Sequence, residues 1–242
     1  MKHKKQIKTP TLGVNAKAYM WGEELLTIAK YCEKIAVDHD VTVTLNVPIV
    51  DIYRIAQAAP HVIINAQFMD PIEPGGTMGG VLAEALAQAG ADGVILNHAS
   101  AKPITLSQLI KSIELAKKAG LYTFVCADSV EGALIIASLH PTGIICEQSK
   151  LIGTGIVASE DYLLATTKAI KDYDANIMVL QGAGIKNGED IYHNIKYGSE
   201  SGGGASGIFC SDDPLAKIDD FLAGILKARK DFGSRIVQDD EA

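Results

Sequence analysis

The amino-acid sequence predicts one α/β domain folded as a (β/α)8 barrel. Short runs rich in Val, Ile and Thr alternate with stretches whose apolar residues recur at helical spacing, which is typical of a parallel sheet with helical crossovers. Eight such units fill 242 residues at about 30 residues each, the density of a compact barrel. A doubly wound open sheet is the alternative, but the G-x-G-x-x-G turn that often follows its first strand is absent.

The predicted strands are rich in β-branched residues, with one exception. They cover residues 11–15, 41–47, 62–66, 93–97, 122–126, 143–146, 177–180 and 199–206. The last of these, 199–206, consists mostly of Ser and Gly and has almost no β propensity. It is assigned as a strand because the count of eight units requires one before the final helix.

The predicted helices carry their apolar residues on one side. In the first, 21–39, Leu25, Ile28, Cys32 and Ile35 recur every three or four residues. The others cover 49–59, 80–89, 106–119, 130–139, 161–173, 188–197 and 213–232. The final helix has a clear start, because Asp213 is a good N-cap and Pro214 suits the first helical position.

Composition and charge restrict the partners and the compartment. A hydrophobic content of 48% supports a substantial core, and a net charge of −7 without a basic stripe argues against nucleic acid. The four cysteines lack metal-ligand spacing and predict reduced thiols in a cytoplasmic protein. No apolar segment follows the basic start, and none could cross a bilayer, so we expect no membrane partner. The domain spans 1–242, with 1–10 as an N-terminal extension and 233–242 as a polar tail.

The most informative stretch is 144–155, where an apolar run ends in Glu147 and a loop with Gly153 and Gly155 on either side of a threonine follows. This pattern indicates a buried strand that delivers a carboxylate to a mobile loop. Glu147 is therefore our candidate catalytic base. The glycines leave backbone N–H groups free to approach an anion.

Other chemically active side chains also lie where predicted strands end. In a barrel, the carboxyl ends of the strands form one mouth, which would collect Asn15, Lys17, His98 and Glu147. Each has a plainer explanation: a solvated lysine, a histidine that caps a helix, or a surface glutamate. A base, an imidazole, a fixed positive charge and glycine-rich turns at one mouth are what proton abstraction beside the carbonyl of a phosphorylated substrate needs.

These residues resemble, in order, the signature of the triosephosphate isomerase family, and most closely its shorter archaeal-type branch. The motifs that carry the resemblance are Asn15-x-Lys17, Leu96-Asn97-His98, Glu147 with Leu151-Ile152-Gly153-Thr154-Gly155, Gly182-Ala183-Gly184-Ile185 and Gly203-Gly204-Ala205-Ser206. The resemblance runs from about residue 12 to residue 232 and implies a TIM barrel. It implies an aldose-ketose isomerase of glycolysis and gluconeogenesis that interconverts dihydroxyacetone phosphate and D-glyceraldehyde 3-phosphate through an enediolate.

The resemblance also implies a role for each residue. Glu147 would move the proton between the two carbons, a neutral His98 would polarise the carbonyl, Lys17 would stabilise the enediolate, and Asn15 would orient oxygen atoms. A helix that starts soon after His98 favours the neutral imidazole. The implied substrate and phosphate contacts are Gly153, Gly182, Gly184, Lys186, Gly203, Gly204, Ala205 and Ser206.

The implied partner is a small sugar phosphate, with neither a metal ion nor an organic cofactor. Relatives are dimers, or tetramers in the archaeal-type branch. The resemblance therefore implies a homodimer or homotetramer, with loop 74–79 as a candidate interlocking element.

The chain departs from the family pattern at several positions. Ser100 stands where the family has a carboxylate near the lysine, Gln148 replaces a proline after the base, Gly202 replaces an apolar residue, and Met78 replaces a threonine. Two further hypotheses therefore stay open: an isomerase of a related sugar phosphate such as a tetrulose phosphate, and a barrel that binds a phosphorylated metabolite without turnover.

Overall fold

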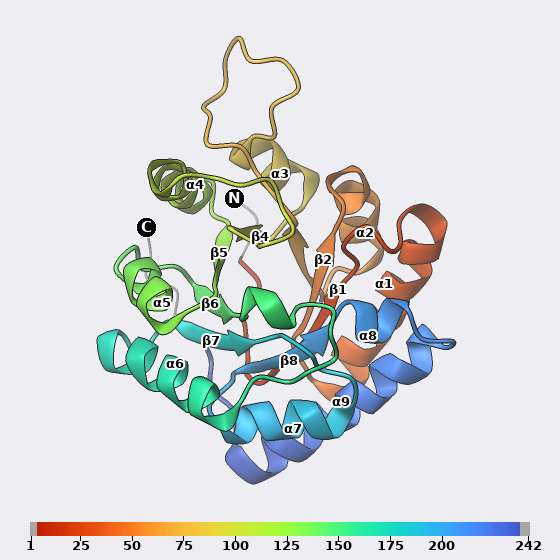
Figure 1. The fold of residues 1–242 in the computed structure, drawn as a ribbon. Helices are drawn as coiled ribbons and strands as arrows, with labels where there is room; N and C mark the ends of the chain where they lie inside the picture. Colours follow the sequence, from red (N-terminus) through yellow and green to blue (C-terminus); the bar gives the residue numbers. More distant parts are fainter. Residues whose placement is uncertain (1–3, 238–242) are drawn as a thin grey trace.

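A computed structural model describes residues 4–237 and contains one sheet of eight parallel strands with helices around it (Figure 1). The strands follow one another around the sheet in the order β7-β6-β5-β4-β3-β2-β1-β8, so that the sheet is a nearly closed barrel. The prediction of a (β/α)8 barrel is confirmed. The strands are β1 (Thr11–Asn15), β2 (Val43–Val47), β3 (Ile63–Ala66), β4 (Gly93–Leu96), β5 (Tyr122–Ala127), β6 (Gly143–Cys146), β7 (Met178–Gln181) and β8 (Ser201–Gly204).

The helices lie between the strands largely as predicted. They are α1 (Gly22–His39), α2 (Ile52–Ala58), α3 (Ala83–Ala89), α4 (Leu106–Lys118), α5 (Val130–Ala137), α6 (Glu160–Tyr173), α7 (Gly188–Lys196), α8 (Ser206–Phe209) and α9 (Pro214–Phe232), with 3-10 turns η1 (Ile49–Asp51) and η2 (Ser149–Leu151). Asp213 caps α9 by accepting hydrogen bonds from the N–H groups of Leu215 and Ala216. The short α8 was not expected, and α3 is shorter than predicted. No helix within 4–237 combines the length and the apolar composition needed to cross a bilayer.

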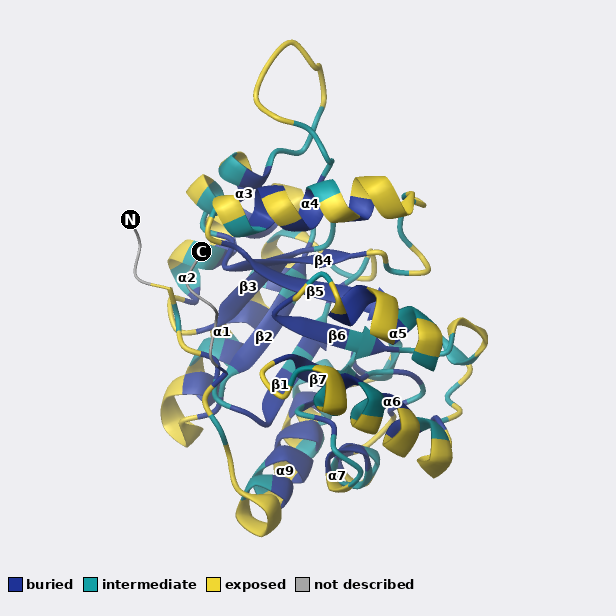
Figure 2. Cartoon of the chain, turned by 90° about the vertical axis from the view of Figure 1, so that its left-hand side faces the viewer, coloured by how far each residue is buried: buried dark blue, intermediate teal, exposed yellow. Residues whose placement is uncertain are grey.

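The main core lies between the strands and the surrounding helices, and a second apolar cluster fills part of the barrel itself. The strands are buried inside a ring of helices whose outer faces are exposed (Figure 2). The inner cluster contains Ile7, Ile63, Ile95, Tyr122, Phe124, Cys126, Met178 and Val237, with Ile145 and Leu180 packed against it.

The two halves of the barrel interior differ in polarity. Toward the mouth, β4 to β7 present large apolar side chains of this inner cluster. The other half, β8 to β3, presents small or polar residues, namely Gly13, Asn15, Thr44, Asn46, Asn65, Ser201 and Gly203. The barrel interior is therefore apolar on one side and polar on the other.

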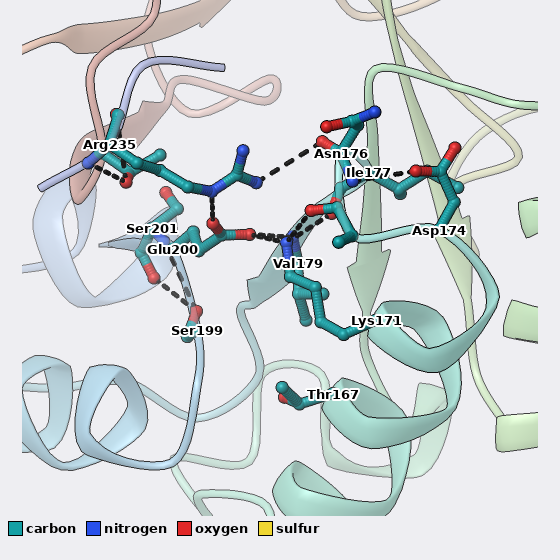
Figure 3. A network of polar contacts seen from close by, with 12 residues as sticks. Thr167, Lys171, Asp174, Asn176, Ile177, Val179, Ser199, Glu200, Ser201 and Arg235 are labelled. Carbon is teal, nitrogen blue, oxygen red and sulfur yellow. Dashed lines mark hydrogen bonds and ion pairs between the residues drawn. The ribbon is translucent and has the colours of Figure 1, made fainter. Parts of the chain in front are cut away.

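The barrel closes between β7 and β8 through Glu200 rather than through a regular strand ladder (Figure 3). The Glu200 N–H donates to Val179 O at 2.7 Å, and the Glu200 carboxylate accepts the Val179 N–H at 2.9 Å. The same carboxylate pairs with Lys171 Nζ at 2.7 Å and with Arg235 Nε. One side chain thus links a sheet edge to helix α6 and to the C-terminal segment.

The two ends of the described chain meet at the far end of the barrel from the mouth. Lys8 and Ile236 form an antiparallel bridge, and the Val237 N–H donates to Ile7 O at 2.9 Å. Ile7 and Val237 are buried in the inner cluster. Positions 7 and 237, expected to belong to an extension and a polar tail, are therefore part of the packed barrel, while the remainder of the predicted tail, 238–242, lies outside the described residues.

The glycine at position 202, which departs from the family pattern, has a packing reason. A Cβ at Gly202 would lie 2.3 Å from Ile191 Cγ2, so α7 approaches β8 too closely for a side chain there. Helices α7 and α9 also pack closely against each other. A Cβ at Gly188 would lie 2.2 Å from Asp220 O, so only glycine fits there. Small residues in this part of the chain allow the last units to pack tightly.

Candidate active site

A cavity of about 370 Å³ opens where the strands end, and it collects all twelve residues predicted for the site. This volume lies within the usual range for small-molecule pockets. The residues are Asn15, Lys17, His98, Glu147, Gly153, Gly182, Gly184, Lys186, Gly203, Gly204, Ala205 and Ser206. Within 4–237, no group of three or more His, Cys, Asp or Glu side chains is arranged to hold a metal ion.

Glu147 extends from the end of β6, where its N–H donates to Ala127 O at 2.9 Å. Its side chain is 16% exposed, and burial raises the pKa of its carboxyl above the ordinary value, with the charge of Lys17 opposing this shift. A Cβ at Gly182 would lie 2.3 Å from Glu147 Oε1. Gly182 therefore leaves room for the carboxylate to lie against the backbone that follows β7.

His98 faces Glu147 across the cavity, with its Nε2 3.6 Å from Glu147 Oε2. This separation is too long for a hydrogen bond. On the other side of the ring, Nδ1 accepts the Ser100 N–H at 3.0 Å and lies 2.9 Å from the Ser100 hydroxyl. Since a ring nitrogen that accepts a backbone N–H carries no proton, Nε2 carries it and points it toward Glu147.

The imidazole of His98 is neutral over most of the pH range. Burial, and then the charge of Lys17, lowers its pKa to about 4. The neutral form was predicted from the start of a helix soon after His98, and α4 begins at Leu106 as expected. The causes that lower the pKa are burial first and the charge of Lys17 second. His98 and Glu147 are consequently not an ion pair.

Lys17 lies in a left-handed backbone conformation at the end of β1, with φ of 43°. Asn15 Oδ1 accepts the Lys17 N–H at 3.0 Å, and Gln67 Nε2 donates to Lys17 O at 3.0 Å. These bonds hold a conformation that is uncommon for a residue with a side chain. Lys17 forms no ion pair with a carboxylate among the residues that the structure describes, so its charge is available to the cavity.

The segment after Glu147 forms a loop over the cavity, visible in green in front of the strands in Figure 1. It contains η2 and two glycines with positive φ, Gly153 at 76° and Gly155 at 70°. The Thr154 hydroxyl donates to Leu151 O at 2.9 Å and accepts the Ile156 N–H at 3.1 Å. The Thr154 hydroxyl thus supports the turn together with backbone hydrogen bonds, among them Thr154 N–H to Leu151 O at 3.2 Å. We refer to residues 148–156 as the lid.

Gly184, packed against the end of the lid, and Gly203, on β8, must both be glycine. A Cβ at Gly184 would lie 2.0 Å from Ile156 O, and one at Gly203 would lie 1.9 Å from Gly13 O. The Lys186 N–H donates to Asp190 Oδ2 at 2.9 Å, while its side chain lines the cavity beside Gly155. Backbone is thus exposed to the cavity on this side, next to a cationic side chain.

Sequence reasoning missed the inner wall of the cavity. Thr44, Asn46, Asn65 and Ser201 line it, although none of them is the last residue of its strand. Polar residues at alternate positions of otherwise apolar strands are the signal that could have identified them.

Comparison with known proteins places this site in a family. The family model described as triosephosphate isomerase matches residues 10–199 of the chain. The chain belongs to the triosephosphate isomerase family.

Relatives in this family cover almost the whole chain. Triosephosphate isomerase of Sulfolobus acidocaldarius is 33% identical over 231 residues, which are 94% of this chain and 100% of the relative. The enzymes of Sulfurisphaera tokodaii and Methanobacterium bryantii are each 34% identical, over 92% and 90% of this chain and 98% of each relative. The resemblance to the archaeal-type branch is therefore confirmed.

The fold also matches a solved member of the triosephosphate isomerase family. The crystal structure of triosephosphate isomerase from Bartonella henselae superposes with a TM-score of 0.69 and covers 92% of this chain and 99% of its own. At 16% sequence identity, this likeness supports the barrel fold only.

Proposed function

We propose that this protein interconverts dihydroxyacetone phosphate and D-glyceraldehyde 3-phosphate. The observation that carries the proposal is that Glu147 and the protonated Nε2 of a neutral His98 face each other, 3.6 Å apart, in a cavity bordered by exposed glycine backbone. A carboxylate base and a neutral hydrogen-bond donor suit proton transfer between two neighbouring carbons. Membership of the family gives independent support.

The reaction follows from these positions. Glu147 removes a proton from the carbon next to the carbonyl, and His98 Nε2–H donates to the carbonyl oxygen. The resulting enediolate is stabilised by the nearby charge of Lys17. Protonated Glu147 then returns the proton to the neighbouring carbon. The roles of base and neutral imidazole are those of the triosephosphate isomerase family, and the geometry of this chain identifies the atoms that would perform them here.

Burial adjusts both groups for this task. The raised pKa of Glu147 makes it a stronger base toward a weakly acidic C–H bond. Because the pKa of His98 is lowered to about 4, its imidazole is neutral near pH 7 and can donate a hydrogen bond without carrying a charge. The phosphate is held by backbone N–H groups around Gly153, Gly184, Gly203 and Gly204, with Lys186 at the rim, and the lid excludes water from the enediolate.

The test is a coupled assay of triose phosphate turnover on wild type and the Glu147→Gln variant. Gln keeps the shape but cannot accept the proton, so kcat falls by about 10²-fold to 10⁴-fold. Glu131→Gln, on the solvent side of α5, is the matched control and keeps wild-type kcat. Substantial activity in Glu147→Gln, or no turnover by wild type, would contradict the proposal.

We also propose that the protein acts in the cytoplasm as a homodimer or homotetramer. All four cysteines are free thiols, as a reducing compartment requires. The loop between β3 and α3 projects from the barrel (Figures 1 and 2), and Met78 in this loop is 98% exposed. Large exposed apolar residues also lie at Trp21, Val50 and Tyr53. Sedimentation velocity decides between the states, and a 25.7 kDa monomer would refute assembly.

A further inference from the structure

The cavity continues below the catalytic pair into the barrel, and one wall of this continuation is polar. Thr44 and Ser201 both line the cavity and lie two residues before Asn46 and Gly203 on their strands. Two residues of extended strand span about 7 Å. The cavity therefore reaches one layer deeper than the strand ends that carry Glu147 and His98.

Several polar groups on this wall lack partners. Asn65 Nδ2 donates to Asn46 Oδ1 at 2.9 Å, which commits that oxygen and leaves the Asn46 amide nitrogen for the cavity. Neither Asn46 Nδ2 nor the Thr44 hydroxyl bonds to another described residue, and both side chains line the cavity. Asn65 Oδ1, which lies close to Gly93 on β4, is buried without a partner. A buried polar group left unpaired costs about 1–3 kcal/mol. The wall is thus suited to a molecule that supplies hydrogen-bonding groups.

The opposite wall of the cavity is apolar. Ile95, Phe124, Ile145 and Leu180 line the same space with apolar side chains. A cavity with hydrogen-bonding groups on one side and hydrocarbon on the other fits a carbon chain that carries hydroxyl groups. Such a chain presents hydroxyls to Thr44 and Asn46 and C–H bonds to the apolar wall.

The order of the strands gives the direction in which such a chain would lie. In the ring, β2 and β3 are four strands from β6 and β7, so they lie across the barrel from the lid and from the glycine turn after β7. A substrate whose phosphate is held at those glycines, and whose reacting carbons lie against both Glu147 and His98, points its other end toward Asn46 and Thr44.

We propose that this polar wall is a subsite for a hydroxylated carbon beyond the reacting carbon, so that the site also accepts acyclic four-carbon 2-ketose 1-phosphates. This inference rests on the proposed function. Glu147 removes the proton from C3, the enediolate forms over C2 and C3, and the proton returns to C2. The C3 hydroxyl proton moves to the C2 oxygen through His98. The carbonyl shifts from C2 to C3 with no net oxidation, so the reaction needs no co-reactant.

The test compares erythrulose 1-phosphate, followed by ¹H NMR for the carbonyl-shifted isomer, with dihydroxyacetone phosphate in the coupled assay. The variants are Thr44→Val and Asn46→Ala, each of which removes a hydrogen-bonding group from the wall. We expect the ratio of the four-carbon to the three-carbon kcat/KM to fall about two- to tenfold in each. Thr27→Val, on the exposed side of α1, is the matched control and keeps the wild-type ratio.

Each of the other outcomes contradicts either the subsite or the proposed function. Turnover of the three-carbon substrate alone by wild type refutes the subsite and leaves the proposed function intact. An equal fall for both substrates in the variants also refutes it, because it indicates a general structural effect. Turnover of neither substrate refutes the proposed function together with the subsite.

Discussion

The Ser100 hydroxyl and N–H both face His98 Nδ1, and this determines which proton the imidazole carries. The family has a carboxylate at position 100, which would stand near Lys17. In this chain the Ser100 hydroxyl is a second hydrogen-bonding group at His98 Nδ1, beside the Ser100 N–H. Lys17 forms no ion pair within 4–237. The departure therefore places more unbalanced positive charge at the cavity and a more firmly oriented imidazole beside it.

The low pKa of His98 predicts a pH-dependent contribution to stability. Unfolded histidine binds its proton below 6.5, whereas folded His98 does so only near 4, so the unfolded chain holds more protons between these values. This contribution is present above pH 6.5 and is lost as the pH falls toward 4. Since the side chain is 11% exposed, wild type loses about 2 kcal/mol more unfolding free energy than His98→Gln between pH 7 and pH 5.

Urea denaturation of both proteins at the two pH values measures this difference. Glu147 titrates in both, so the opposite contribution from its raised pKa cancels in the comparison. Equal losses in wild type and His98→Gln would show that the imidazole is not held neutral by burial.

The catalytic residues could be predicted from the sequence because each follows an apolar run at a strand end. Glu147 and His98 needed only the rule that strand ends in a barrel share one mouth. The inner-wall residues Thr44 and Asn46 could not be predicted in this way. Their signal is a different one: the sequence of β2, Val-Thr-Leu-Asn-Val, alternates apolar and polar residues, and the rule about strand ends does not use this alternation.

At the scale of elements, one hydroxyl group supports the turn of the lid beside its backbone hydrogen bonds. Thr154→Ala removes the bonds to Leu151 O and from the Ile156 N–H, so the turn between the two positive-φ glycines keeps only its backbone bonds. We expect kcat/KM for triose phosphate to fall about tenfold to thirtyfold, since two hydrogen bonds of about 1 kcal/mol each are involved. Inorganic phosphate released per turnover should rise, because a looser lid admits water to the enediolate.

Thr154→Ser is the matched control for the lid, because it keeps the hydroxyl and loses only a methyl group. It should resemble wild type in both the coupled assay and the phosphate assay. If Thr154→Ala also resembles wild type, the lid is held by contacts other than this hydroxyl.

The residue that begins the lid departs from the family without changing the backbone. Gln148 has φ of −63°, which is the value that a proline ring imposes. The glutamine therefore adopts the proline conformation in the folded chain but does not restrict the unfolded one.

Strand β8 shows where local propensity fails. Segment 201–204 reads Ser-Gly-Gly-Gly, which no propensity scale favours as a strand. It forms because Gly203 pairs with Gly13 on β1, and a side chain at position 203 would clash with that backbone. Closure of the barrel requires glycine at this close backbone contact. The sequence predicts the strand only because eight β/α units are needed.

At the scale of the whole molecule, stability depends on the closure between β7 and β8. Burial alone would raise the pKa of Glu200, but the hydrogen bond from Arg235 and the charge of Lys171 outweigh it and hold the pKa below its ordinary value. The carboxylate is 14% exposed. Its stabilising contribution is therefore present above the unfolded pKa, 4.5, and is lost as the pH falls through the lower folded value.

Glu200→Gln should lower the free energy of unfolding at pH 7 by about 1–3 kcal/mol, because it leaves the partly exposed cations of Lys171 and Arg235 without their charged partner. Thermal and urea denaturation measure the change. The kcat/KM for triose phosphate should stay at the wild-type value, since Glu200 does not line the cavity. Asp172→Asn, which removes an exposed pair with Lys168 on α6, is the control and should change stability by at most about 1 kcal/mol. A Glu200→Gln protein as stable as this control would mean that strand β8 is held without the carboxylate.

Residues 7–8 and 236–237 lie side by side at the far end of the barrel. Segments near the two ends of the described residues are therefore neighbours, although they are far apart in the sequence. A chain that began at another strand and kept the same sequence of neighbours could form the same barrel. A genetic rearrangement that joined these ends and opened the chain in the projecting loop near Met78 would keep every neighbour relation around the barrel.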